Sequence, residues 1–238
     1  MAGHSKWANI KRRKEKVDAK RGKIFSRVAK EIITAVKQGG SPDPRMNARL
    51  KAAIDRAKEV NFPQDNIDRN IKKASSSDQG EYFALTYELY GHGGVGIVVE
   101  ILTDNKNRTS SDMRIATNKR GGSIATPGSV LFQFDRKGVV RVMKSTIEEE
   151  KLFMIALEAG VDEIESSDEE FILFTHVDDL LEIKEKLALQ GILILQAEFE
   201  QIPKTLVEVD EENRIKNEDL IDWIENLDDV DAVFTNMA

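Results

Sequence analysis

The spacing of apolar residues predicts three helices in the first third of the chain. Over residues 23–37, apolar side chains recur every three or four positions, as they do on one face of an amphipathic helix. Asp43 followed by Pro44 predicts the N-cap and first turn of a second helix, which runs to about Val60. A third, shorter helix ends near Ala74. The residues expected in the shared core are Ile24, Val28, Ile32, Val36, Met46, Leu50, Ala53, Ile54, Ala57, Ile67 and Ile71.

After residue 80 the pattern changes to short apolar runs separated by turns, which is typical of strands. Strands are expected at 82–90, 95–103 and 130–134, with a helix at 109–120. From residue 138 the predicted order is β-α-β-β-α-β, which is the ferredoxin-like order. Its strands are expected at 139–143, 162–165, 171–175 and within 192–202. Its helices are expected at 147–159, opened by a capping box of Ser145 and Glu148, and at 178–190.

The last 35 residues predict one more β-α-β piece, with strands at 206–209 and 232–235 around a helix at 218–227. This piece and the one at 80–134 are each incomplete, so we expect them to share one sheet. The predicted fold class is therefore α+β with three domains. These are a basic helical domain (1–76), a discontinuous α+β domain (77–134 and 204–238) and an inserted ferredoxin-like domain (135–203).

Charge is divided along the chain in the same way. Residues 1–74 hold 20 of the 35 Lys and Arg residues but only 8 of the 42 Asp and Glu residues, a net charge of +12. The remainder has a net charge of −19. A basic segment of this kind favours a polyanion partner, because docking on phosphates releases condensed counterions. The acidic part would be repelled from the same polyanion, so we expect it to position the basic part.

The cations of the first two helices lie in stripes opposite their apolar residues. Spacings of three, four and seven residues bring the members of each stripe to one helix face. Such a face is either solvated or binds nucleic acid, and the small number of interleaved carboxylates favours nucleic acid. The members are Lys23, Arg27, Lys30 and Lys37 on the first helix and Arg45, Arg49 and Arg56 on the second.

The N-terminal arm (residues 1–22) is richer still in cations. Trp7 lies among them, where it either stacks on an unpaired base or anchors the arm on the helices. The cations of the arm expected to contact nucleic acid are Lys6, Lys11, Arg12, Arg13, Lys14, Lys16 and Lys20.

Two loops resemble ligand-binding motifs. Residues 91–96 match G-x-G-x-x-G by letters, but an apolar β-branched run follows, so the glycines predict a hairpin turn rather than a dinucleotide site. Residues 104–109 lead into a helix and carry Lys106 and Arg108, which would allow an anion to dock. The alternative is a plain turn with Thr109 as the N-cap.

The sequence contains few residues arranged in a way that would indicate catalysis or metal binding. The three histidines are far apart in the sequence, and there is no cysteine. Acidic pairs such as Asp178-Asp179 and Asp228-Asp229 are explained as residues at helix ends. We therefore expect no enzyme activity, no catalytic residue, no metal and no cofactor. No run of about 18 apolar residues predicts a membrane span, and no secretory signal is recognised, so a cytoplasmic protein is expected.

Several motifs resemble the YebC/PmpR family. The opening residues 2–14, AGHSKWANIKRRK, are the most specific match. Further matches are GKIFS at 22–26, NFP at 61–63, YE with YG at 87–91, LTDN with NRT at 102–109, and GG at 121–122 with Gly128.

The resemblance implies a three-domain protein with a helical N-terminal domain, a cleft and two α+β domains. It also implies one of two functions. Bacterial members are described as DNA-binding transcriptional regulators. Mitochondrial relatives activate translation, and members are linked to ribosomes stalled on proline-rich stretches. The charge pattern suits either a DNA-binding transcriptional regulator or a translation factor that binds ribosomal RNA, because phosphates dominate both interfaces.

Overall fold

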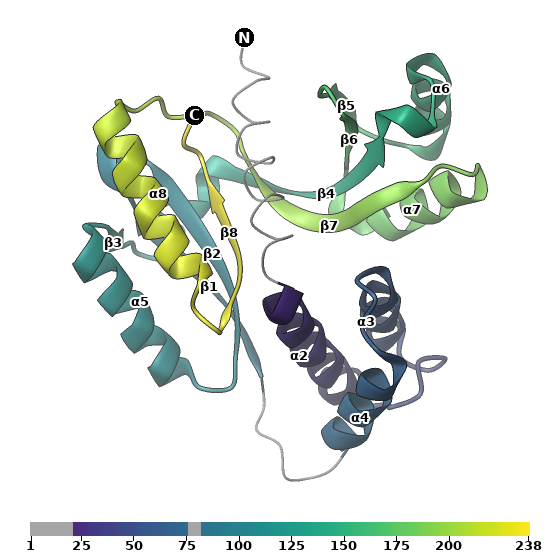
Figure 1. Cartoon of the computed structure of the whole chain (residues 1–238), viewed down its shortest axis with the longest axis horizontal. Coiled ribbons are helices and arrows are strands. Elements are labelled where there is room, and N and C mark those ends of the chain that lie inside the picture. The colour runs from purple at the N-terminus through teal and green to yellow at the C-terminus, as the bar shows by residue number, and fades with distance from the viewer. Residues whose placement is uncertain (1–20, 76–81) are drawn as a thin grey trace.

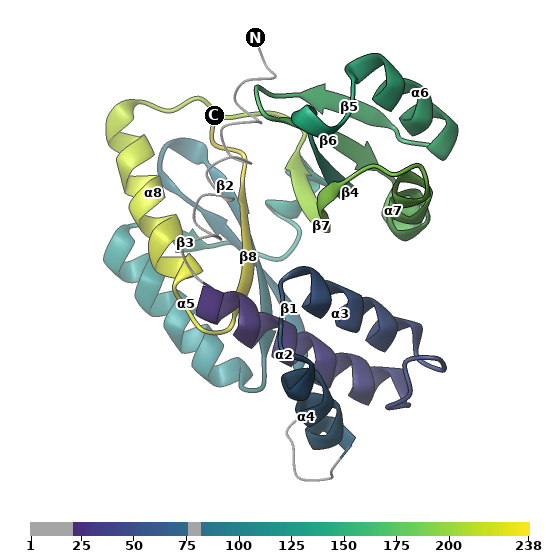
Figure 2. The ribbon, with the colours of Figure 1, turned by 45° about the vertical axis from the view of Figure 1, so that its right-hand side comes forward.

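The computed structural model describes residues 21–75 and 82–238, with side chains from residue 24, as a mixed α+β structure (Figures 1 and 2). A group of helices, here called the head (residues 21–75), lies beside two antiparallel four-stranded sheets, which together form the body (residues 82–238). The α+β fold class predicted from the sequence is confirmed.

The head consists of three helices around a small apolar core. Its central residues Ile32, Leu50 and Ile67 are fully buried. Phe25 and Phe62 meet edge to face beside them, with ring centroids 5.1 Å apart. The helices are α2 (Arg21–Gly39), α3 (Ala48–Glu59) and α4 (Gln64–Ser75).

The second helix begins later than predicted. Its N-cap is Asn47, whose side-chain oxygen accepts the N–H of Leu50 at 3.0 Å while its amide donates to the carbonyl of Ala35 at 2.8 Å. Asp43 instead closes a separate turn before the helix, in which its carbonyl accepts the N–H of Met46 at 3.0 Å. Met46 therefore lies outside the core, 79% exposed, and its assignment to the core was wrong.

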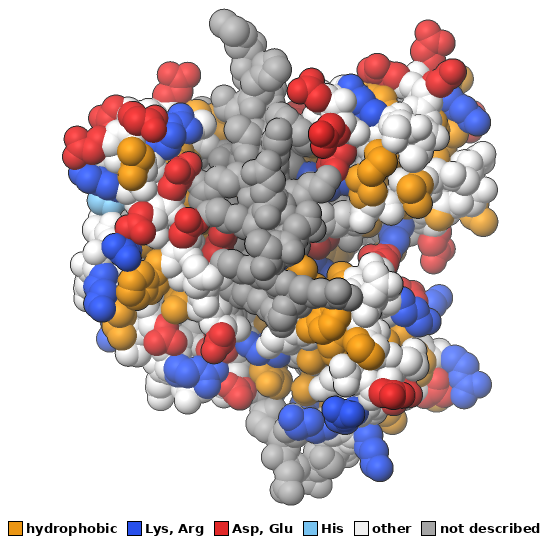
Figure 3. Space-filling model, viewed as in Figure 1, with side chains coloured by type: hydrophobic (Ala, Val, Ile, Leu, Met, Phe, Trp, Pro, Cys, Tyr) orange, Lys and Arg blue, Asp and Glu red, His pale blue; other side chains and the backbone are white. Residues whose placement is uncertain are grey.

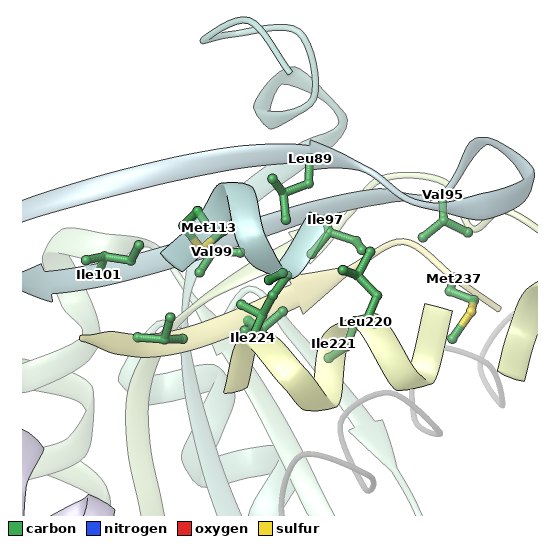
Figure 4. Close-up of a cluster of buried hydrophobic side chains, with 13 residues drawn as sticks. Leu89, Val95, Ile97, Val99, Ile101, Met113, Leu220, Ile221, Ile224 and Met237 are labelled. Carbon is green, nitrogen blue, oxygen red and sulfur yellow. The ribbon is translucent and has the colours of Figure 1, made fainter. Parts of the chain in front are cut away.

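The first sheet of the body has the strand order β3-β1-β2-β8 and takes its last strand from the end of the chain. Two helices cover one face of this sheet, and Figure 4 shows their side chains packed on those of the strands. Met113 and Leu220 are fully buried there. The elements are β1 (Phe83–Tyr90), β2 (Gly96–Thr103), α5 (Lys106–Arg120), β3 (Ser123–Ile124), α8 (Glu211–Glu225) and β8 (Val230–Thr235).

The second sheet has the order β5-β6-β4-β7 and is built from one continuous stretch of chain between the two parts of the first. Its β-α-β-β-α-β sequence with β4 and β6 at the centre is the ferredoxin-like order, as predicted. Both helices pack on one face, around Leu152 and Leu187. The elements are β4 (Phe134–Met143), α6 (Glu149–Ala159), β5 (Glu163–Ser166), β6 (Glu170–Thr175), α7 (Leu180–Leu189) and β7 (Ile194–Pro203).

Two predicted strands are wrong. Residues 130–133 form a turn with a 3₁₀ segment at Leu131–Gln133, and β4 begins only at Phe134, because the buried Glu88 carboxylate accepts the N–H groups of Val130 and Leu131, both at 2.7 Å. These groups are thereby withdrawn from strand pairing. Residues 206–209 make a single bridge from Val207 to the end of the chain rather than a strand.

Of two local features predicted from the sequence, the capping box is absent from the structure and the glycine hairpin turn is present. The predicted capping box is absent, because Ser145 lies in a 3₁₀ turn and α6 begins only at Glu149, without a side-chain cap. The glycines between β1 and β2 do form a hairpin turn: Gly93 and Gly94 have φ of 68° and 82°, a region that glycine enters at no steric cost.

Candidate nucleic-acid interface

The head carries an exposed cationic surface on α3, α4 and the turn before α3. Figure 3 shows Lys and Arg side chains gathered over these helices. In this surface we include every exposed Lys and Arg side chain of the described head. They are Arg45, Arg49, Lys51, Lys58, Arg69, Lys72 and Lys73.

Two shallow grooves run between these cations. One, of about 650 Å³, has Ile54 and Ile71 in its apolar lining and Lys58, Lys72 and Asp68 among its polar lining. The other, of about 690 Å³, continues past Lys51. An apolar floor between cations suits a nucleotide chain, because bases and sugars can contact the floor while phosphates meet the cations.

Only part of the predicted site lies on this surface. Arg45 and Arg49 do, the first paired with Asp43 at 2.8 Å and the second in contact with Gln38. The predicted residues Lys6, Trp7, Lys11, Arg12, Arg13, Lys14, Lys16 and Lys20 lie outside the described residues, as does the side chain of Lys23. The sequence pattern did not single out Lys51, Lys58, Arg69, Lys72 and Lys73, although it predicted their helices.

Three predicted cations, here called the inner cations (Arg27, Lys30 and Arg56), face the body. We expected them on a solvent-facing stripe, and the structure corrects that expectation. Helical spacing does align Arg27 and Lys30 opposite the apolar residues, but the surface they meet is acidic.

Each inner cation contacts a carboxylate of the body. Arg27 pairs with Asp231 on β8, and Arg56 pairs with Glu198 on β7 at 2.9 Å. Lys30 reaches Asp229 at 3.2 Å and donates to the carbonyl of Asp228 at 2.8 Å. Burial alone would lower the pKa of the Arg27 guanidinium, but the nearby carboxylates, led by Asp231 and Glu198, outweigh burial and raise it. The guanidinium therefore stays charged in this partly covered position.

Asp229 is the centre of the most extensive of these contacts. It lies in the turn before β8, and its side chain accepts hydrogen bonds from Arg108 at 2.7 Å and from Thr103 and Thr109, both at 3.0 Å. Burial would raise the pKa of this carboxyl, but these donors and the charge of Lys30 outweigh burial and lower it. Asp229 is therefore a buried, ionised acceptor and not the helix-end residue that the sequence suggested.

The N-cap predicted for the loop at 104–109 is wrong. Asn105, not Thr109, is the N-cap of α5, and its side chain accepts the N–H groups of residues 107 and 108. The Arg108 guanidinium is held by Asp229 and by Asp104, the latter at 2.9 Å. Lys106 lies over the ring of Phe83, 3.9 Å from its centroid. Arg108 therefore serves the internal structure of the body.

No constellation for metal chemistry appears among residues 21–75 and 82–238, where three or more His, Asp or Glu side chains nowhere converge on a possible ion. His92 contacts the carbonyl of Arg120 at 2.8 Å, and His176 is exposed. Across the same described residues, no helix combines the length and apolar character needed to cross a bilayer.

Family models match nearly the whole chain. The model described as the TACO1/YebC protein N-terminal domain matches residues 5–77, and that of the TACO1/YebC second and third domain matches residues 82–237. This chain belongs to the TACO1/YebC family. The resemblance seen in the sequence motifs is thereby confirmed, and the head described above corresponds to the N-terminal domain of the family.

Relatives in the TACO1/YebC family align from end to end. A probable transcriptional regulatory protein of Protochlamydia amoebophila is 57% identical over all of this chain and 96% of its own length. One of Chlamydia pneumoniae is 55% identical over the full length of both chains. The crystal structure of a conserved hypothetical protein from Aquifex aeolicus superposes with a TM-score of 0.84 at 38% identity, covering 93% of this chain and 92% of its own.

Proposed function

We propose that this YebC-family protein is a nucleic-acid-binding regulator of gene expression, and specifically a DNA-binding transcriptional regulator that docks through its basic head. The observation that carries the proposal is the exposed cationic surface, with seven Lys and Arg side chains over two helices and the turn before them. The names of the relatives, probable transcriptional regulatory proteins, support a role in transcription.

Ribosomal RNA is the second candidate target, with translation as the regulated process. The apolar-floored grooves favour it, because recognition of RNA relies on unstacked bases that need apolar or aromatic contact, whereas duplex DNA offers mainly phosphates to such a surface.

The test compares the binding of a labelled DNA duplex and a labelled ribosomal RNA fragment by fluorescence anisotropy over a range of salt concentrations. The variant replaces Lys51, Lys58 and Lys72, which line the grooves, with Ala. The matched control replaces three exposed lysines of the body, at positions 151, 186 and 216. Both proteins lose three positive charges, so only the position of the charges differs.

The groove variant should bind more weakly than the control, and the slope of log K against log salt should fall by about 0.7–0.9 for each phosphate that the variant no longer neutralises. Equal affinities of the two variants would refute the head as the docking surface. Tighter binding of DNA than of RNA at equal salt would support transcription, and the reverse order would support translation.

A further inference from the structure

The interface between head and body is joined by ion pairs rather than by a shared apolar core. The buried apolar residues of the head form a cluster separate from those of the two sheets, and Tyr82, at the start of the body, packs against the head cluster. Among the described side chains, four ion pairs cross the interface, three of which belong to the inner cations. In the fourth, Lys184 on α7 pairs with Glu59 on α3. Figure 2 shows α2 beside the first sheet and α3 below the second, so the head is tied to both.

The carboxylates that meet the inner cations are chemically similar to the phosphates of a nucleic acid. Carboxylate and phosphate oxygens accept the same charge-assisted hydrogen bonds from guanidinium and ammonium groups. Asp231 on β8 and Glu198 on β7 come from two different sheets and Asp229 from the turn before β8, yet all three converge on one face of the head. The body therefore presents an anionic surface to the cations that sequence analysis assigned to nucleic acid.

Separation of head and body would leave most of these groups with a partner on their own side. Within the head, Glu31 lies 3.2 Å from Arg27 and 3.3 Å from Arg56, so both keep a carboxylate. Within the body, Asp229 keeps Arg108, and Glu198 accepts a hydrogen bond from Gln196 at 2.6 Å. Because these groups keep a counterion or a donor, separation costs less free energy than it would if each charge were left unpaired.

We propose that Asp229, Asp231 and Glu198 act as an intramolecular substitute for phosphate that holds the inner cationic face of the head closed until a nucleic acid displaces it. This inference rests on the proposed function and adds its regulation. The exposed cationic surface makes the first contact, and the phosphates that follow compete with the body carboxylates for Arg27, Lys30 and Arg56. The opened head then binds through two faces.

Fluorescence energy transfer between head and body tests this in the full chain. The sequence has no cysteine, so Asp65→Cys on α4 and Glu185→Cys on α7, both exposed, place two dyes at defined positions. Wild-type transfer should fall as salt rises, because salt screens ion pairs, and should fall at constant salt when a DNA duplex or ribosomal RNA fragment saturates the protein.

Two double variants distinguish displacement of the interface carboxylates from a general effect of lowering the negative charge of the body. Asp231→Asn with Glu198→Gln removes two of the three carboxylates and leaves the more buried Asp229 in place. The control, Asp228→Asn with Glu163→Gln, removes two exposed body carboxylates. The first variant should open at lower salt and bind nucleic acid about fivefold more tightly than the control, as expected for two partly exposed ion pairs.

The results of the energy-transfer and binding measurements test this inference separately from the proposed function on which it rests. Binding accompanied by loss of energy transfer supports both. Binding with unchanged energy transfer overturns the displacement of the carboxylates and leaves the proposed function standing. Absence of binding to either nucleic acid overturns the proposed function and the inference together.

Discussion

Replacing Asp229 with Asn removes the negative charge that holds together the turn before β8, the start of α5 and the first helix of the head. Asp229 is 6% exposed and accepts hydrogen bonds from Arg108, Thr103, Thr109 and Lys30. Asn keeps one acceptor oxygen but turns an NH₂ group toward donors that need an acceptor. The variant therefore loses both the charge and part of the hydrogen bonding.

The cost can be estimated from these contacts. Removing one partner of a fully buried ion pair costs about 3–5 kcal/mol, chiefly because a charge is left buried and unpaired. Here the Arg108 side chain is 46% exposed and also pairs with Asp104, so much of its charge remains solvated and compensated. We therefore expect a loss of about 2 kcal/mol, which corresponds to a fall in melting temperature of about 4–8 °C for a chain of this length.

Thermal unfolding followed by circular dichroism measures this loss. The matched control is Asp228→Asn, because Asp228 is exposed and offers Lys30 only its main-chain carbonyl, which the substitution keeps. The control should stay within about 0.5 kcal/mol of wild type. If Asp229→Asn is as stable as the control, Asp229 does not stabilise the fold as a buried, shared carboxylate.

The same substitution has a pH dependence with a defined sign. The pKa of Asp229 is lowered in the folded protein, so its contribution is present above the ordinary Asp pKa of about 3.9 and is lost as pH falls through the folded value. The stability difference between wild type and Asp229→Asn should therefore be constant from about pH 7 to about pH 5 and shrink below about pH 4.

Three further predictions test the core, the loop and the arm. Glu88→Gln should speed amide exchange of Gly128, Val130 and Leu131, whose N–H groups the carboxylate accepts at 2.5–2.7 Å, and cost about 1–3 kcal/mol in urea unfolding; unchanged exchange would contradict this role. Leu220→Ala, which empties the centre of the first sheet's core, should cost about 2–5 kcal/mol by the same measurement, and a loss below about 1 kcal/mol would disprove that placement. Reversing the four charges at 11–14 should weaken nucleic-acid binding and flatten its salt dependence, and unchanged anisotropy at two salt concentrations would exclude the arm.

Local patterns predicted the elements that are stabilised locally. The helical period of residues 23–37 and the glycines at 121, 160 and 191 mark helices and stops that the structure contains, because one buried face and one positive-φ residue suffice to define them. The ferredoxin-like order followed from the same rules. The start of α3 was predicted wrongly, because two nearby residues could each have capped the helix. The pair Asp43-Pro44 is typical of a helix start, but the buried Asn47 side chain caps α3 and also donates to a carbonyl of α2.

The partners of the inner cations could not be predicted, because they are fixed by contacts between distant parts of the chain. Lys30 and Asp229 are 199 positions apart, and no periodicity relates them. Helical spacing shows that Arg27 and Lys30 share a face but not what that face meets. The only indication in the sequence was the separation of positive and negative charge along the chain. That separation is compatible with ion pairing between the head and the body as well as with binding of the head to a nucleic acid.

Crosslinking of the full chain to bound nucleic acid shows directly which face of the protein the nucleic acid contacts. The protein is irradiated with a DNA duplex and, separately, with a ribosomal RNA fragment, and the crosslinked peptides are mapped by mass spectrometry. We expect crosslinks within residues 45–73, over the exposed cationic surface, and at saturation additional crosslinks near Arg27 and Lys30. Crosslinks confined to residues 82–238 would contradict this expectation.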